Sequence, residues 1–114
     1  MNINHLHLNA ADVRTSTKFF ETYFGFRKKA DHGDGVFLVN DDGFLVAIDP
    51  RKDEYLFPSW FHYGFCLDDG DQVKHVYERM QAGNVPIAKE LIEFEGEAVA
   101  FRCLDPNGCQ VEVS

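Results

Sequence analysis

The sequence predicts an α+β fold built from two βαβββ modules. The first observation is a repeated pattern: a strand with an early histidine, followed by an acidic residue that starts a helix, occurs at residues 4–12 and again at 61–69. The second is the spacing of equivalent landmarks, with 57 residues from His5 to His62 and 58 from Gly25 to Gly83. Such a period is too long for a solenoid and indicates a duplicated domain.

Size and charge restrict the class of protein. The 114 residues suit one domain, and 45% hydrophobic residues can form a core. We expect a single domain over 1–114, with module one at about 1–50, a linker at about 49–60 and module two at about 61–114. The net charge is −8 and the longest basic cluster is 27–29, so nucleic acids and anionic membranes are poor partners. No apolar run approaches the roughly 20 residues of a membrane span.

The cysteines and the N-terminus suggest a compartment. Cys66, Cys103 and Cys109 form neither a disulfide framework nor the spacing of a structural zinc site. The first residues lack the basic and apolar regions of a secretory signal. We therefore expect a reducing, cytoplasmic location.

Module one can be followed element by element. Residues 3–9 alternate as a strand, with Ile3, His5, His7 and Asn9 on one face. Asp12 is a good N-cap for a helix over 13–24, and Gly25 is a good residue to end it. A strand is expected at residues 26–30, because the helix has already ended at Gly25. Apolar runs at 36–40 and 44–48 flank an Asp-Gly pair, which predicts a hairpin.

The linker contains two prolines and no sustained period, and then the pattern starts again. A strand is expected at 62–67. Asp69 or Asp71 caps a helix with an apolar stripe at helical spacing, and Gly83 ends it. Strands are expected at 87–92, 98–104 and 109–113. Residues 105–108 form the turn of the last hairpin.

Three side chains in the repeat could hold a metal. His5 and His62 occupy equivalent positions, and Glu112 follows the hairpin glycine Gly108 by four residues. Two imidazoles and one carboxylate suit a divalent transition metal and leave coordination positions open for substrate. The alternative is structural: a single strand histidine is commonly hydrogen-bonded or exposed, and a glutamate near a chain end is commonly solvated.

The chain resembles the vicinal oxygen chelate superfamily, which includes glyoxalase I, bleomycin-resistance proteins, fosfomycin-resistance thiol transferases and extradiol dioxygenases. The matching stretches are 4–12, 19–26, 62–65 and 104–112, and together they extend over essentially the whole chain. The resemblance implies that the curved sheets of the two modules form a cleft. It also implies a homodimer, in which module one of each chain can pair with module two of its partner.

The metal ligands of the family fall on His5, Ala47, His62 and Glu112 of this chain. Ala47 can neither bind a metal nor accept a proton, so the resemblance disfavours the isomerisation catalysed by glyoxalase I. Only two residues follow Glu112, so we do not expect the C-terminal arginine with which fosfomycin enzymes bind their anion. Dioxygenases of the superfamily usually have more than two modules.

Four further residues are candidates for the cleft. His7 lies on the face of His5 and is a candidate general acid or base. Arg102, Trp60 and Cys66 are candidates for substrate binding. Each has a structural alternative. His7 can be a polar side chain at the rim of the cleft, and Arg102 can pair internally with an acidic residue. Trp60 can belong to the core, and Cys66 can be a small buried apolar residue.

The sequence thus supports two function classes. The first is a lyase or transferase that uses Mn, Fe, Ni, Co or Zn, held by His5, His62 and Glu112, as a Lewis acid on a small oxygenated substrate. The second is a protein of the bleomycin-resistance type that binds and sequesters a small-molecule drug without metal. The charge of −8 would suit a cationic ligand. A third possibility is a structural member with neither activity.

Overall fold

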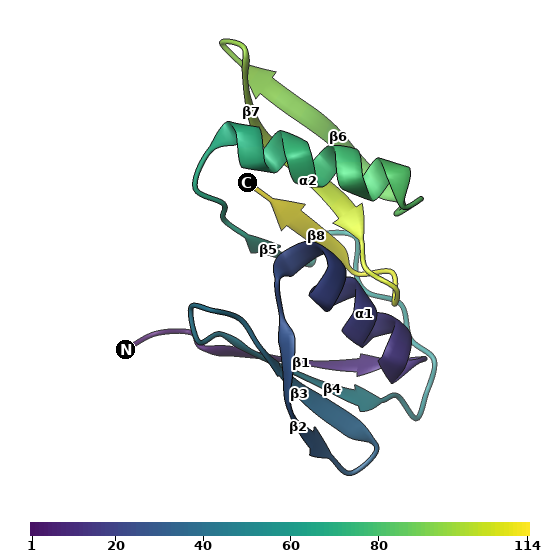
Figure 1. Ribbon diagram of the computed structural model, residues 1–114. Coiled ribbons are helices and arrows are strands. Elements are labelled where there is room, and N and C mark those ends of the chain that lie inside the picture. The colour runs from purple at the N-terminus through teal and green to yellow at the C-terminus, as the bar shows by residue number, and fades with distance from the viewer. The chain divides into compact units, whose positions relative to one another are not determined.

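The computed structural model describes all 114 residues. They form two compact units, Met1–Tyr55 and Leu56–Ser114. Each unit contains one strand, one helix and three further strands in chain order (Figure 1). The predicted α+β fold of two βαβββ modules is confirmed.

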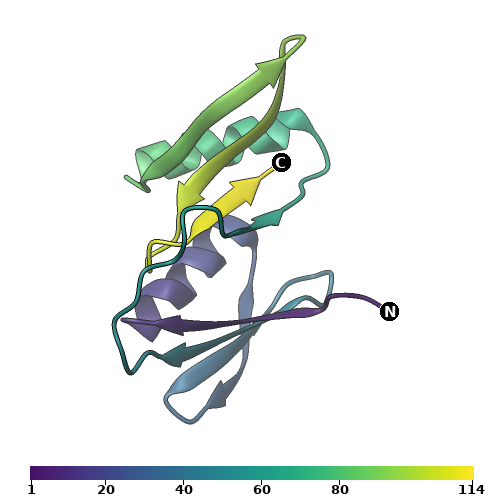
Figure 2. The same ribbon diagram turned by 180° about the vertical axis from the view of Figure 1, so that it is seen from behind.

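The first unit is a four-stranded sheet with one helix. Its elements are β1 (His5–Ala10), α1 (Val13–Phe24), β2 (Arg27–His32), β3 (Gly35–Val39) and β4 (Leu45–Pro50). The strand order is β1-β4-β3-β2. β1 runs parallel to β4, and the other two pairs are antiparallel. The helix connects β1 to β2 and covers one face of the sheet; Figure 2 shows this sheet in front of α1.

Helix α1 begins and ends where the sequence predicts. The Asp12 carboxylate accepts hydrogen bonds from the backbone N–H groups of Arg14, at 2.9 Å, and Thr15, at 3.2 Å. Such a cap contributes about 1 kcal/mol. At the other end Gly25 has φ +68°, a left-handed conformation in which a residue with a Cβ is strained. The core under this helix contains Phe20, Leu38, Val46 and Ile48, all almost fully buried.

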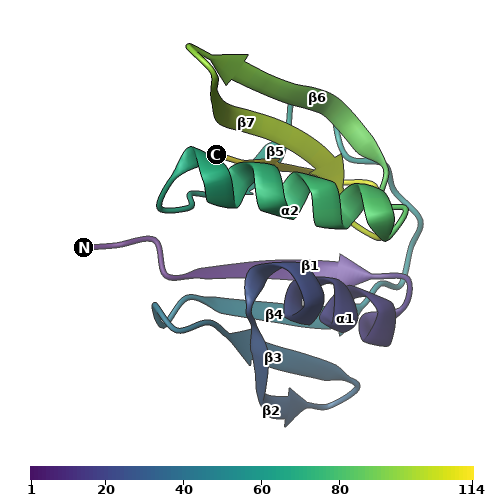
Figure 3. The same cartoon turned by 45° about the horizontal axis from the view of Figure 1, so that its top comes forward.

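The second unit repeats the architecture. Its elements are β5 (His62–Phe65), α2 (Gly70–Ala82), β6 (Ile87–Phe94), β7 (Glu97–Leu104) and β8 (Gln110–Val113). The strand order is β5-β8-β7-β6, with β5 parallel to β8. Figure 3 shows α2 lying along β7. Its core contains Met80, Phe101, Val111 and Val113.

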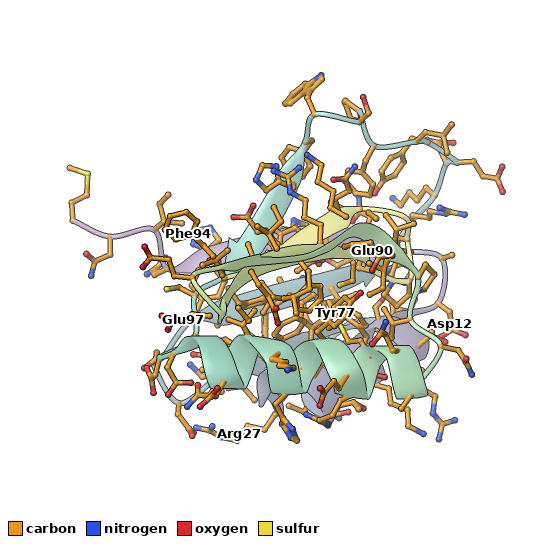
Figure 4. All side chains as sticks on the ribbon, turned by 90° about the horizontal axis from the view of Figure 1, so that it is seen from above. Asp12, Arg27, Tyr77, Glu90, Phe94 and Glu97 are labelled. Carbon is orange, nitrogen blue, oxygen red and sulfur yellow. The ribbon has the colours of Figure 1, made fainter.

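The ends of α2 settle one alternative and agree with one expectation. Asp69, not Asp71, is the N-cap, because its carboxylate accepts from the backbone N–H of Gln72 at 2.9 Å. Gly83 follows the helix as predicted, but the residue with positive φ is Asn84, at 59°. In the middle part of the helix, the Tyr77 hydroxyl donates a hydrogen bond to the carboxylate of Glu90 on β6. Figure 4 shows the two side chains pointing toward one another.

Strand limits differ from the expectations by a few residues. The predicted linker from residue 49 begins too early, because Asp49 and Pro50 continue β4 opposite Asn9 and Ala10. The strand expected at 26–30 begins and ends one to two residues later, since it pairs with β3 as far as His32. β6 extends two residues further than expected, to Phe94. No helix is long and apolar enough to span a membrane.

Candidate functional site

In the first unit, the candidate residues lie on the sheet face opposite α1. Alternation along β1 turns Leu8 and Ala10 into the core and leaves His5 and His7 exposed on the other face. Ala47 pairs with His7 in the parallel register, so it lies on this same face. It provides no donor atom there, as the sequence implies.

His5 has one ring nitrogen occupied and one open. Its Nδ1 lies 2.8 Å from the side-chain oxygen of Asn4, which can only accept. Nδ1 therefore carries the proton and donates to Asn4. Nε2 keeps its lone pair, through which a histidine oriented by a hydrogen bond at its other ring nitrogen can bind a metal.

His7 is oriented by a carboxylate. Its Nε2 lies 2.6 Å from Oδ2 of Asp49, with the imidazole more exposed than the carboxylate (57% against 27%). Gly35 makes the room for this pair: a Cβ at that position would lie 2.3 Å from Oδ1 of Asp49. Because the carboxylate accepts the hydrogen bond, Nε2 carries the proton and Nδ1 is left to exchange protons with another molecule.

In the second unit, the corresponding face carries His62, Arg102, Gln110 and Glu112. His62 pairs with Gln110 between β5 and β8, and Arg102 pairs with Glu112 between β7 and β8. The residues between them, including Val111 and Cys103, point into the core. His62, Arg102, Gln110 and Glu112 therefore share one sheet face.

Arg102 connects the two predicted ligands of this unit. Its Nε donates to Oε1 of Glu112 at 3.4 Å, and its Nη2 donates to Nε2 of His62, also at 3.4 Å. Nη1 donates to the side-chain oxygen of Gln110 at 3.2 Å. Since arginine has no acceptor, Nε2 of His62 must present a lone pair. The internal pairing foreseen as an alternative for Arg102 is present.

Gly64 leaves room for Glu112. It lies opposite Glu112 in the β5–β8 register. A Cβ on Gly64 would lie 2.8 Å from the backbone oxygen of Glu112 and 3.2 Å from its Cβ, so the two strands would have to move apart. The glycine two residues after His62 is therefore part of what positions the carboxylate.

A buried hydrogen-bonded group on the opposite face fixes the turn before Glu112. Oδ1 of Asp105 accepts from the backbone N–H groups of Asn107, at 2.9 Å, and Cys109, at 3.0 Å, and Oδ2 accepts from the Tyr63 hydroxyl at 2.8 Å. Burial raises the pKa of Asp105 above its ordinary value, against the opposing effect of these donors. Burial, and next the charge of Asp105, raise the pKa of Tyr63 well above its usual range.

The other predicted residues have different surroundings. Cys66 follows β5 and is exposed, which corrects the alternative of a buried apolar residue. Burial raises the pKa of both Cys103 and Cys109 to about 12, so these thiols stay protonated. Trp60 lies before β5, packs edge-on to Phe61, and is 75% exposed, so it does not belong to the core.

The three predicted ligands come from both units. His62 and Glu112 lie on one sheet face of the second unit, whereas His5 belongs to the first unit. No group of three or more His, Cys, Asp or Glu side chains is arranged to hold a metal ion. The donors themselves fit a divalent transition metal, because two imidazole nitrogens and a carboxylate oxygen are its ordinary protein ligands.

Sequence reasoning missed Asn4, Asp49 and Gln110. The sequence analysis places Asp49 in the linker, whereas the alternation Leu45, Ala47, Asp49 puts it on the face of His7 once the strand is continued by two residues. Gln110 shares the parity of Glu112, two residues away. Asn4 precedes β1 and had no signal beyond being adjacent to His5.

Comparisons with known proteins agree with this architecture. Residues 2–113 match the model of the Glyoxalase/Bleomycin resistance protein/Dioxygenase superfamily. The chain is similar to the glutathione transferase FosA of Serratia marcescens, with 25% identity over 114 residues that span 97% of this chain and 78% of that protein.

Two solved structures share the fold. A possible glyoxalase from Bacillus cereus is similar with a TM-score of 0.84 and 29% identity, over 99% of this chain and 97% of that one. The fosfomycin resistance protein FosX of Listeria monocytogenes is similar with a TM-score of 0.81 and 21% identity, over 98% and 88% of the two chains. At the lower identity, the similarity shows the fold alone.

Proposed function

The chain belongs to the Glyoxalase/Bleomycin resistance protein/Dioxygenase superfamily, and from this premise we propose that it is a metal-dependent enzyme of lyase or transferase type acting on a small oxygenated molecule. Its ligands would be His5, His62 and Glu112. The divalent metal would be Mn, Fe, Ni, Co or Zn. Similarity to a glutathione transferase along 97% of the chain favours group transfer among these reactions.

One observation carries the proposal. Nε2 of His62 and Oε1 of Glu112 both face a cation, the guanidinium of Arg102, at 3.4 Å each. A neutral imidazole nitrogen and a carboxylate oxygen directed at one positive charge are the donors that a divalent metal requires. The face that carries them is open, because His62 is exposed.

His5 completes the proposed set. Because Nδ1 of His5 donates its hydrogen bond to Asn4, the lone pair of Nε2 is the one that can bind a metal. His62 presents the same ring atom. Hydrogen bonds of this kind orient metal-binding histidines and raise their basicity. We propose a homodimer in which His5 of one protomer joins His62 and Glu112 of its partner. The three free thiols fit a reducing, cytoplasmic location.

In the proposed reaction, the metal would polarise the substrate and His7 would transfer the proton. A bound metal would act as a Lewis acid that polarises a substrate oxygen. Nδ1 of His7 would accept a proton from the substrate or nucleophile, while Asp49 holds Nε2–H and stabilises the positive imidazolium. Ala47 provides no base at the fourth family position, so we do not propose glyoxalase isomerisation.

Metal analysis tests the proposal. Protein purified without a histidine tag is incubated with each of the five metals, dialysed and analysed by mass spectrometry. We expect stoichiometric retention of at least one metal, and loss of it in His62→Ala and in Glu112→Ala. His75→Ala is the matched control, because His75 is an exposed histidine of α2. Retention of none of the metals by the wild-type protein would refute the proposal.

A second candidate is a metal-free protein that binds a small-molecule drug. It is favoured by the same arginine, since the guanidinium already neutralises Glu112 without a metal. The net charge of −8 suits a cationic ligand. Saturable binding of a cationic aromatic compound by metal-free protein, unchanged in His62→Ala, would favour this function over the first.

A further inference from the structure

We propose that Arg102 and the metal exclude one another at His62 and Glu112, so that metal binding displaces the guanidinium and frees it to bind an anionic oxygen group of the substrate. This inference rests on the proposed metal-dependent function. It adds a role for Arg102 and a substrate class, small molecules that carry a carboxylate or a similar oxyanion.

The contacts of Arg102 use the atoms that a metal would need. Nη2 donates to the lone pair of Nε2 of His62, and Nε donates to Oε1 of Glu112. A lone pair that accepts a hydrogen bond is not available to a metal at the same time. The metal can therefore bind these two atoms only after Arg102 has withdrawn.

Charge adds to this competition. A divalent ion bound to His62 and Glu112 would lie beside a permanent positive charge, because arginine stays protonated at any physiological pH. The repulsion is stronger between groups that are shielded from water than between fully exposed ones. The side chain of Arg102 is such a group, since it is only 18% exposed. The metal and the guanidinium are thus alternatives for one pair of ligands.

The displaced guanidinium has one partner left and an open surface beside it. Gln110, its third partner, is uncharged and lies next to exposed His62 in the strand register. The flexible arginine stem allows the head group to move while its methylene groups stay packed. A planar guanidinium without a carboxylate partner binds carboxylates and similar oxyanions in a two-point contact. It would thus hold such a group next to the metal.

Metal titration measures the exclusion directly. We expect Arg102→Met to bind Mn²⁺ at least about tenfold more tightly than the wild type by calorimetry, because the competing cation is gone. Arg102→Lys retains the charge but loses the two-point contact, so its affinity should lie between the two. Arg27→Met is the matched control: it removes an arginine from an exposed ion pair with Asp41, in the other unit, and should leave the affinity unchanged.

The outcomes separate the two proposals. If the wild type binds Mn²⁺ as tightly as Arg102→Met or more tightly, the exclusion is wrong while the metal-dependent function stands. If neither protein binds any of the five metals, both are wrong. Thermal unfolding of each variant shows whether it is folded, and Arg102→Lys provides the comparison if Arg102→Met is not.

An NMR measurement follows the arginine itself. The Nε–H signal of Arg102, identified by its loss in Arg102→Lys, should shift when diamagnetic Zn²⁺ is added. Acetate should then shift the Arg102 signal further in Zn²⁺-loaded protein. It should not do so in metal-free protein, where the guanidinium is paired with Glu112. A signal that does not respond to Zn²⁺ would overturn the exclusion. Equal acetate affinity in Zn²⁺-loaded Arg102→Met, measured by calorimetry, would overturn the anion-binding role.

Discussion

Three histidines on the open sheet faces differ in which ring nitrogen is available. His5 donates from Nδ1 to Asn4, and His62 accepts at Nε2 from Arg102, so both present the Nε2 lone pair. His7 is the reverse, because Asp49 holds its Nε2–H and leaves Nδ1 open. This difference at the level of single atoms separates the two proposed ligands from the proposed acid and base.

Asp49→Asn tests the role of Asp49 in positioning His7. Nitrogen NMR at a pH where histidine is neutral should show mainly the Nε2–H form of His7 in the wild type. In the variant we expect a mixture of the two tautomers, because an amide can donate as well as accept. The proposed enzyme should also lose roughly 10- to 100-fold in kcat with little change in KM, since the proton acceptor is misplaced.

Asp42→Asn is the matched control for this experiment. It makes the same change of charge on an exposed turn of the same unit, where Asp42 provides only its backbone N–H to Asn40. We expect the wild-type tautomer and the wild-type rate. A His7 spectrum that is identical in Asp49→Asn and in the wild type would show that Asp49 does not position the ring.

At the scale of elements, β5 is tied to the turn before β8 on the side away from the site. Tyr63 lies between His62 and Gly64 on β5, and its hydroxyl reaches Asp105 in the turn that leads to Glu112. The two proposed ligands therefore depend on a buried hydrogen bond that neither of them makes.

Tyr63→Phe should lower the free energy of unfolding by about 1–3 kcal/mol at neutral pH, because it removes a donor from a buried carboxylate. The loss should be smaller in acid, where Asp105 is protonated. The pKa of Asp105 is raised in the folded protein, so the native state binds the proton more tightly than the unfolded chain. Stability attributable to Asp105 is thus present at low pH and falls as pH rises through the raised pKa.

The hydrogen bond from Tyr63 lowers the pKa of Asp105. Without it, the loss of stability that accompanies deprotonation of Asp105 should extend to higher pH. Urea unfolding of both proteins over a series of pH values measures the difference. Tyr55→Phe is the control: the Tyr55 hydroxyl donates to the uncharged backbone oxygen of Asn9, so its small effect should not vary with pH. An effect of Tyr63→Phe that is the same at acid and neutral pH would contradict this account.

At the scale of the whole molecule, the two units have the same topology but carry different polar side chains. Both units have the same order of elements and the same sheet order, with the first strand parallel to the last. The second unit carries His62 with Glu112, whereas the first carries His5 and His7 with Ala47 and Asp49. The first unit thus provides the proposed base and one ligand, and the second provides the other two ligands.

Mixed dimers test whether the ligands come from different chains. A chain with His5→Ala and a chain with Glu112→Gln are produced together, each with a different tag free of histidine, and the mixed species is isolated. If each site combines His5 of one protomer with Glu112 of the other, one of the two sites is intact, and about one metal should bind per dimer. Each variant alone should bind none.

Sites formed within one chain would give mixed dimers that bind no metal, because every site would then contain one substituted ligand. Analytical ultracentrifugation of the wild type should first show a dimer. A monomeric protein that retains its metal would exclude the exchange and leave the proposed ligand set intact.

The sequence by itself determined the two βαβββ modules, the ends of α1 and the shared face of His5 and His7 on β1. These features follow from local rules: alternation along strands, helix caps and the residues that turns require. That His62 and Glu112 share a face follows instead from the pairing of β5 with β8, in which Gly64, two residues after His62, lies opposite Glu112.

Only the tertiary structure decided which side chains become partners. Asp49 meets His7 across 42 residues of chain, and Arg102 meets His62 across 40. Such pairs depend on the register between strands that are distant in sequence, and on small residues such as Gly35 and Gly64 that allow close approach. Local periodicity contains no information about register. The sequence therefore made Arg102 a candidate, but its position between His62 and Glu112 was known only from the folded sheet.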